Sequence, residues 1–377
     1  GSNLSATRVN ASQLIEKGRE NVLLQSNQFD TNWGSSNTTE TSGQSGYDGS
    51  SDAWLLSKSA ANGYLIQSIS SSGVQTLSVY AKAGNLNWLR LNINFTGGTD
   101  PVAFFDLANG LLGSTPTGVI DSNIQSIGGG WYRCDITANG TISDIRIFPA
   151  DADNDTSGTS GNIVIQDSQL ELGLVATDVI ETTTTTGKAG ILEDTPRFDY
   201  LGATCPSLLL EPSRTNIFVQ SEYFTGGDWD LNAGTTLTDN YATSPEGVQN
   251  ATRYLGVGTS GLGDKYTLVN GTQYTISAYV KSNTGATQNC RLIGDSSNVS
   301  NDLEITTEWT RIDYTWTSGG LANKTNGLFR DSSNNDIDIL IFALQLEAGS
   351  YATSYIPTYG VSQTRAKDVI NQNIQSI

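Results

Sequence analysis

An internal duplication constrains the fold of this chain more than any other feature of its sequence. The stretch NVLLQSNQF at 21–29 returns as NIFVQSEYF at 216–224, with apolar residues at the same three positions. Three further pairs follow in the same order: TLSVYAK (76–82) and TISAYVK (275–281), WYRCDIT (131–137) and WTRIDYT (309–315), QLELG (169–173) and QLEAG (345–349). This repetition predicts two copies of one domain, of roughly 165 residues each.

Short segments that precede each copy are also related. Glu16 aligns with Glu211, and the triplet at 7–9 has partners at 196–198 and 364–366. We interpret these segments as lead-ins that dock each copy, and a third lead-in near 364 predicts a longer parent protein. The predicted division is 1–183 for a lead-in and the first module, 184–215 for a linker and the second lead-in, and 216–377 for the second module.

Within each copy the apolar residues have the period of a β-strand. Leu77, Val79 and Ala81 alternate with polar residues, and 88–95 repeats this pattern. Further strands are predicted at 131–137, 163–172, 273–281, 289–293, 309–317 and 337–346. Turns rich in Gly, Asn, Asp and Ser separate them. We therefore predict an all-β fold with two tandem antiparallel β-sandwich (jelly-roll) domains, in which 12–19 is the one weak helix candidate.

Composition narrows the classes of function. The chain has no histidine, which excludes Ser-His-Asp and Cys-His catalysis and every histidine-ligated metal site. The 38 acidic and 20 basic side chains give a net charge of −18, which disfavours nucleic acid and anionic membranes as partners. No apolar run is long enough to span a membrane. The three cysteines have no metal-ligand spacing, and Cys134 is predicted to be a buried free thiol.

One strand face carries side chains suited to binding a sugar. Trp88, Arg90, Asn92 and Asn94 all point outward from the strand at 88–95. An aromatic ring stacks on a pyranose, while guanidinium and amide groups bond its hydroxyls. Tyr80 and Lys82 join this candidate glycan site if the two strands pair. The alternative is that Trp88 packs under a loop or against the other copy.

A second candidate is the acidic turn at 151–155. Asp151, Asp153 and Asp155 begin like a calcium loop, because hard cations prefer clustered carboxylates. The turn fails the EF-hand pattern, since Thr156 stands where glycine is needed and Asn162 where the bidentate glutamate belongs. We predict no cofactor and read the segment as a solvated turn, with a structural calcium ion as the alternative.

Some residues recur in both copies and are read as parts of the fold. Glu171 and Glu347 each follow Gln-Leu, and no motif places a second carboxylate opposite either of them, so a glycosidase pair is not indicated. We predict no enzyme activity. The tryptophan pairs Trp131/Trp309 and Trp33/Trp229 are likewise interpreted as structural. Arg133 and Asp135, at alternate positions after Trp131, are expected to contribute to a cross-strand ion pair on the outer face of the sandwich.

The repeated blocks resemble modules of bacteriophage virion-surface proteins. WYRCDIT after a glycine run, TLSVYAK, FDLANG at 105–110 and the ending QLELG…AT are similar to repeats in tail and other surface proteins of marine phages. So are SLLLEPSRTN…QSEYF and QLEAGSYATSYIPT…TRA in the second half. The order of the strands is also similar to jelly-roll carbohydrate-binding modules. The second copy departs from the phage pattern, because it lacks an FDLANG-like block.

The resemblance implies a protein of the virion surface, extracellular and non-catalytic. It implies that host-surface glycan and other virion proteins are the partners, and that the chain is a homo-oligomer such as a trimer, whose valency multiplies weak sites. Two alternatives stay open: a purely structural fibre or capsid decoration module, and carbohydrate-binding modules of a secreted polysaccharide-degrading enzyme.

Overall fold

The fold comes from a computed structural model that describes residues 4–115 and 118–369. Within these ranges no helix is present, and every paired strand is antiparallel. The predicted class, all-β with two tandem antiparallel sandwiches, is confirmed. The helix candidate at 12–19 is wrong, because Ile15 and Lys17 both point into a protein interior, an alternation that only a strand permits. No described segment forms a helix that could cross a lipid bilayer.

The chain divides into two compact units. One runs from Arg19 to Ala189, and the other combines the residues up to Gly18 with those from Gly190 onward. This division differs from the predicted grouping, since the first lead-in packs with the second module.

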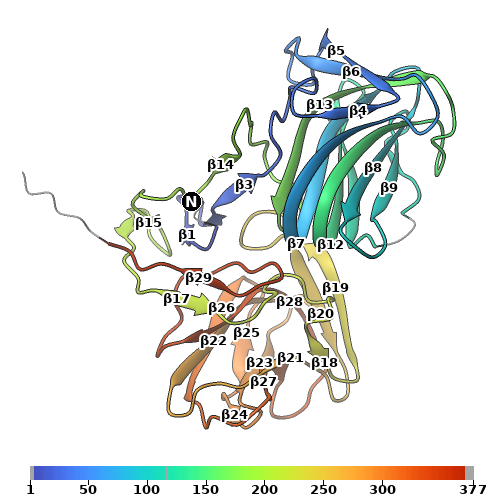
Figure 1. The fold of residues 1–377 in the computed structure, drawn as a ribbon. Coiled ribbons are helices and arrows are strands. Elements are labelled where there is room, and N and C mark those ends of the chain that lie inside the picture. Colours follow the sequence, from blue (N-terminus) through green and yellow to red (C-terminus); the bar gives the residue numbers. More distant parts are fainter. Residues whose placement is uncertain (1–3, 116–117, 370–377) are drawn as a thin grey trace, which may run out of the picture. The chain divides into compact units, whose positions relative to one another are not determined.

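The first unit is one ten-stranded sheet that folds over a single core, together with a two-stranded ribbon formed by β3 and β14. Two 20-residue strands, β7 and β12, pair along their lengths and belong to both layers (Figure 1). The described strands of this unit are β3 Arg19–Asn21, β4 Gly34–Ser36, β5 Thr38–Gln44, β6 Ala53–Lys58, β7 Tyr64–Ala83, β8 Trp88–Phe95, β9 Val102–Asp106, β10 Leu111–Leu112, β11 Asp121–Gly128, β12 Trp131–Ala150, β13 Gly161–Leu172 and β14 Gly187–Ala189.

The second unit contains two separate sheets over its own core, in the orders β18-β21-β27-β23-β24 and β19-β20-β28-β22-β26, with β25 paired to β23. The strands of its sandwich are β18 Asp230–Leu231, β19 Thr235–Ala242, β20 Ala251–Gly256, β21 Gly261–Tyr266, β22 Gln273–Ser282, β23 Gln288–Gly294, β24 Asn298–Val299, β25 Leu303–Ile305, β26 Thr310–Thr317, β27 Lys324–Arg330 and β28 Ile337–Ala348. Its two-stranded ribbons are formed by β1 Thr7–Val9 with β2 Ile15–Lys17, β15 Phe198–Asp199 with β16 Ser207–Leu208, and β17 Arg214–Asn216 with β29 Gln363–Arg365.

The predicted strands and core residues are found in both units. Leu77, Val79 and Ala81 are fully buried, as are Leu89 and Leu91 of the next strand. The tryptophans Trp33 and Trp229 close equivalent corners of the two cores, beside Phe29 and Phe224. Cys134 is a buried free thiol as predicted; Cys290 is also buried and free, and Cys205 is exposed.

The β3–β14 ribbon of the first unit and the β17–β29 ribbon of the second unit are equivalent, and their pairing shows which lead-in residues correspond. Arg19 lies opposite Ala189 in the first unit, and Arg214 lies opposite Arg365 in the second. Arg365 therefore occupies the place of Ala189, and it forms an ion pair with Glu211 at 3.0 Å. Arg197 of the second lead-in reaches the same carboxylate.

Candidate functional site

The residues predicted to bind glycan on β8 do share the outer face of one layer. The guanidinium of Arg90 lies over the ring of Phe148, 4.4 Å from its centroid, and donates to Asn92 at 2.7 Å. Asn92 donates in turn to Asn94, which donates to Asp144. Both asparagines are buried, at 3% and 8% exposure. Their amides are thus engaged by protein groups.

Trp88 and the pair Tyr80 and Lys82 lie in different settings. A Cβ atom at Gly113 would come within 2.6 Å of the Trp88 ring, so the 111–114 segment covers part of the indole. Tyr80 belongs to the other layer, where its ring stacks on Tyr47 at 3.9 Å. Lys82 follows it there, opposite Trp131. The structure does not bring Tyr80 and Lys82 together with Trp88, because Lys82 lies opposite Trp131 at the start of β12 and Trp88 lies opposite Ala150 at its end.

The three aspartates of the acidic turn face different partners. Asp151 forms a 2.6 Å ion pair with Lys58, Asp153 accepts from Ser114, and Asp155 accepts from the backbone N–H of Ser157. Among the described residues, no three acidic or cysteine side chains are grouped in a way that could hold a metal ion. The predicted solvated turn and its alternative, a structural calcium ion, both stay predictions.

The repeated glutamates are buried fold elements. Glu171 accepts from Gln169 and from both the N–H and the hydroxyl of Thr177, at 2.6 to 2.8 Å. Glu347 makes the same three contacts in the second copy, and its carboxylate is fully buried. Each glutamate therefore fixes the turn that follows its strand.

The environment of Arg133 and Asp135 differs from the expected ion pair. Arg133 donates to the hydroxyl of Ser78 and to the carbonyl of Thr177. Asp135 accepts a 3.5 Å hydrogen bond from Asn123 of β11, the strand that covers it. Burial, with Asp121 nearby, raises the pKa of Asp135 to about 7 against the lowering effect of Arg133.

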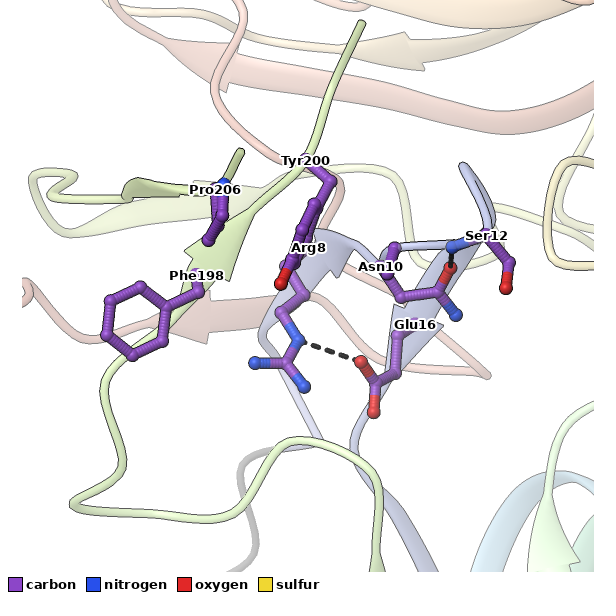
Figure 2. A pocket seen from close by; sticks show the side chains of 8 residues that line it. Arg8, Asn10, Ser12, Glu16, Phe198, Tyr200 and Pro206 are labelled. Atoms are coloured by element: carbon purple, nitrogen blue, oxygen red, sulfur yellow. Dashed lines mark hydrogen bonds and ion pairs between the residues drawn. The ribbon is translucent and has the colours of Figure 1, made fainter. Parts of the chain in front are cut away.

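A site that the sequence did not predict lies on the lead-ins of the second unit. A cavity of about 550 Å³ is bordered by the β1–β2 ribbon and the segment around β15. Its lining residues are Arg8, Asn10, Ala11, Ser12, Glu16, Phe198, Tyr200 and Pro206 (Figure 2).

Local structure explains why two aromatic rings border this cavity. Asp199 accepts a 2.7 Å hydrogen bond from the N–H of Val9, and Tyr200 donates its N–H to the carbonyl of Val9 at 3.0 Å. The side chain of Asp199 is thus directed at the first lead-in. Phe198 and Tyr200 flank it at alternate positions and share the opposite side of the segment. Phe198 is 45% exposed, and Tyr200 is half-buried.

The other wall of the cavity is polar. Arg8 and Glu16 stand opposite each other in the β1–β2 ribbon and form a 2.7 Å ion pair, with both side chains about one quarter exposed (Figure 2). The Asn10 side chain accepts from the N–H groups of Ser12 and Leu14 and so shapes the adjoining turn. Two rings facing a guanidinium, a carboxylate and an amide can bind a ligand that has both apolar and hydroxyl surfaces.

Sequence reasoning missed this cavity because its walls are about 190 residues apart in the chain. One signal was present: Phe198 and Tyr200 alternate in a lead-in whose counterpart at 7–11 has no aromatic residue. The two lead-ins are otherwise aligned by their arginine and glutamate residues. Aromatic residues that only one of them has indicate a role that the other lead-in does not share.

Among solved structures, the chain is similar to the tandem CBM22-1–CBM22-2 domain of Paenibacillus barcinonensis Xyn10C. The two are 10% identical with a TM-score of 0.31, over 88% of this chain and 98% of that one. The CBM22-1 xylan-binding domain of the same protein is 13% identical with a TM-score of 0.28, over 37% of this chain and 94% of that one.

A third similar structure contains the CBM22-1 and GH10 modules of Clostridium thermocellum xylanase 10B with xylohexaose. It is 19% identical with a TM-score of 0.28, over 37% of this chain and 29% of that one. No protein-family model and no curated protein matches the sequence. At TM-scores this low, the three likenesses say nothing about the ligand of this chain.

Proposed function

We propose that this chain is a non-catalytic glycan-binding protein and that the cavity beside Phe198 and Tyr200 is its glycan site. The observation that carries the proposal is the pairing of two accessible rings with a polar wall around a cavity of about 550 Å³. Ring faces accept the C–H faces of a pyranose, and Arg8, Asn10 and Glu16 offer hydrogen-bonding groups to its hydroxyls.

The charge of the chain bears on which glycan binds. Arg8 is the one cation among the lining residues, and Glu16 neutralises it at 2.7 Å. The chain as a whole carries a net charge of −18, which repels anionic polysaccharides. We therefore expect a neutral glycan.

The same residues support binding without hydrolysis. Glycosidases that use carboxylates need two of them, separated by roughly 5–10 Å across the scissile bond. Glu16 is the one carboxylate among the lining residues, and it is paired with Arg8. The lining therefore lacks the second carboxylate that such a mechanism needs.

We place the protein on a bacteriophage virion surface, as a tail fibre, tail spike or head fibre, and outside the host cell. This placement rests on the resemblance of its repeated blocks to phage modules. It includes a homo-oligomer such as a trimer, in which several weak sites act together. Carbohydrate-binding modules of a secreted enzyme are the alternative with the same ligand class.

A purely structural decoration module is the second candidate function. It is favoured by how firmly the first lead-in is held on the second module, where Thr7 donates to the carbonyl of Tyr355 and Lys17 pairs with Glu222. A segment fixed in this way can serve assembly alone.

The test is a glycan array followed by titration with the best neutral glycan, on wild type, Tyr200→Ala and Trp88→Ala. Removing the ring of Tyr200 is expected to weaken binding about fivefold, since the lost stacking is on the order of 1 kcal/mol. Trp88→Ala serves as the matched control and should bind like wild type. Arms with calcium and with chelator test whether a calcium ion contributes.

Two results would contradict the proposal. Binding that is lost in Trp88→Ala but kept in Tyr200→Ala would move the site to the first sandwich. Absence of binding to any glycan, at high protein concentration and with the fold intact by circular dichroism, would favour the structural role.

A further inference from the structure

Lys17 of the first lead-in ends in a buried cluster inside the second sandwich. Its ammonium lies 2.8 Å from Glu222 and 2.7 Å from Glu246, and it donates to the hydroxyl of Tyr359 at 2.8 Å. Asn250 completes the cluster. All of these side chains are at least nine-tenths buried except that of Tyr359, with exposures of 7% for Lys17, 0% for Glu222, 6% for Glu246 and 2% for Asn250.

Two carboxylates bridge the amine of Lys17 and the amide of Asn250. Oε2 of Glu246 lies 2.7 Å from Nζ of Lys17 and 2.8 Å from Nδ2 of Asn250. Glu222 makes a similar bridge, with Oε1 on Nζ at 2.8 Å and Oε2 on Nδ2 at 3.3 Å. The two nitrogen atoms therefore share Oε2 of Glu246 as an acceptor and are bridged a second time by Glu222. The Oδ1 atom of Asn250 is buried and has no hydrogen-bond partner in the described part of the chain.

The charges of the cluster also point to proton transfer. One ammonium faces two carboxyl groups in a site closed to solvent, so a second proton is favoured there. Burial raises the pKa of Glu222, although Lys17 lowers it and Glu246 raises it further. Cleavage of an amide requires a group that takes a proton from the amine and returns it to the leaving nitrogen, and Oε2 of Glu246 lies within hydrogen-bond distance of both nitrogens.

We propose that Lys17 and Asn250 react to form an intramolecular isopeptide bond that fastens the first lead-in to the second sandwich. Glu246 takes a proton from the ammonium of Lys17, and the neutral Nζ attacks Cγ of Asn250. Glu246 then passes the proton to Nδ2, the Cγ–Nδ2 bond breaks, and ammonia leaves. Of the two protons left on Nζ, one stays as the hydrogen of the new amide and the other is transferred to the ammonia, which departs as ammonium. One C–N bond forms and one breaks, and nothing is oxidised or reduced.

The geometry gives each participant a defined part. The lead-in and the fold hold amine and amide together, which replaces an encounter between separate molecules by a reaction within one site. Tyr355 and Tyr359 donate to Oε1 of Glu222 at 2.8 and 3.1 Å and so fix that carboxylate beside Nζ. The bond would form only after folding, because the lysine and the asparagine are 233 positions apart.

In the part of the chain that the structure describes, the first module has neither the lysine nor the asparagine at the equivalent position of its fold. Asp52 stands where the second module has Asn250, and its carboxylate accepts from the amide of Gln166 at 2.9 Å. Among the described residues near it, no lysine is found in the role of Lys17, so the first module has a hydrogen-bonded version of the cluster. This contrast singles out the second module as the one equipped to react.

Intact-mass spectrometry under denaturing conditions tests the proposal on the full chain. Wild type is expected to be lighter than its sequence mass by one ammonia, and Lys17→Arg and Glu246→Gln should have their full sequence masses. Lys17→Arg keeps the cation but cannot form this amide. Trypsin, which cleaves after arginine and unmodified lysine, should release a branched peptide that joins residues 9–19 to 215–253.

Three outcomes would overturn the proposal. Wild type at its full sequence mass would leave an ordinary ion cluster. A loss of ammonia that persists in Lys17→Arg would come from another asparagine. A loss of water in place of ammonia would mean that a carboxyl group, and not Asn250, is the partner. None of these readings depends on glycan binding, so the result is independent of the proposed function.

Discussion

Each module has an eight-residue loop at the equivalent place in its fold, but different residues cover this loop in the two modules. In the loop at 45–52, Gly46 donates its N–H to the carbonyl of Ser50 at 3.0 Å, and at 243–250 Ser244 donates to Val248 at 2.9 Å. The fifth residue of each loop is a glycine, with φ of +87° and +86°, which glycine adopts without steric cost. The backbone of the loop is thus the same in both copies.

The side chains that complete the loop come from different parts of the chain. In the first module Tyr47 stacks on Tyr80, and Gln166 donates its amide to Asp52. In the second module Pro245 replaces the tyrosine, and its carbonyl accepts from the N–H of Ile15 at 2.8 Å. Ile15 then packs on Phe342 and Tyr355.

This difference indicates which segments of the chain stabilise each module. The first module caps its acidic loop with its own residues. The second module uses a lead-in more than 200 residues away in sequence, with Ile15 as the apolar plug and Lys17 as the cation. Removing the lead-in should therefore damage the second module and spare the first.

The largest effect is expected for Lys17→Ala. The change leaves Glu222 and Glu246 buried without the Lys17 nitrogen that lies between them, which costs roughly 3–5 kcal/mol of unfolding free energy. Burial lowers the pKa of Lys17, but the two carboxylates raise it well above its ordinary value, so the lysine enters the cluster as an ammonium before any bond to Asn250 forms. Calorimetry should show a lower transition temperature for the second module and an unchanged transition for the first.

Lys265→Ala is the control for this substitution. Lys265 pairs with Asp230 at 2.6 Å, but both side chains are about half exposed. Such a pair contributes about 0–1 kcal/mol. Equal shifts for Lys17→Ala and Lys265→Ala would mean that the buried cluster does not stabilise the second module.

The second-largest effect is a pH dependence of stability that is expected for Asp135 and not for its counterpart Asp313. Strand β11 covers Asp135 in the first module, and its equivalent Asp313 is exposed on β26 at the edge of its sheet. The pKa of Asp135 is raised to about 7, so the unfolded chain releases this proton near pH 4 and the folded chain near pH 7. Stability from this group is therefore full below pH 4 and is lost as the pH rises to 7.

Asp135→Asn should accordingly stabilise the first module by roughly 2–4 kcal/mol at pH 8 and by little at pH 4. Urea unfolding followed by tryptophan fluorescence at the two pH values measures this difference. Asp313→Asn should change nothing at either pH. A gain for Asp135→Asn that is the same at pH 4 and pH 8 would rule out the buried charge as its cause.

Periodicity and repetition explain how much of the molecule the sequence predicted. Alternating apolar residues identified the strands, since each buried side chain leaves a mark at every second position. The recurrence of Glu171 as Glu347 showed that both serve the fold. Alternation also predicted that Asn92 and Asn94 point out of the core. It does not predict what covers an outward side chain. Here Asn92 donates a hydrogen bond to Asn94, and both side chains are buried.

Periodicity and repetition could not predict features that are built from segments far apart in the chain. The cavity at Phe198 and the cluster at Lys17 each join residues about 190 or more positions apart, which no local pattern records. The full length of β7 was missed for a local reason: Ser68 and the serines at 70–72 interrupt its apolar pattern, yet the backbone continues to pair with β12.

The smallest effect concerns the ring that caps the first loop. Tyr47 donates its hydroxyl to Asp167 at 2.8 Å, and burial raises the pKa of Asp167 to about 6 while this hydrogen bond lowers it. Tyr47→Phe keeps the stacking on Tyr80 and removes the donor. A hydrogen bond to an ionised group contributes about 1–2 kcal/mol, so the first module should lose that amount at pH 8.

At pH 5 the carboxyl of Asp167 is mostly protonated, and the loss should be smaller, because a neutral acceptor gains less from the phenol. Tyr241→Phe, at a tyrosine that is 43% exposed, provides the control and should be neutral at both pH values. Urea unfolding measures the effect of Tyr47→Phe on the first module and that of Tyr241→Phe on the second module, which contains Tyr241 in β19. If Tyr47→Phe cost nothing at pH 8, the ring alone would cap the loop, and the first module would then resemble the second more closely, since Ile15 caps its loop by packing and without any side-chain hydrogen bond of its own.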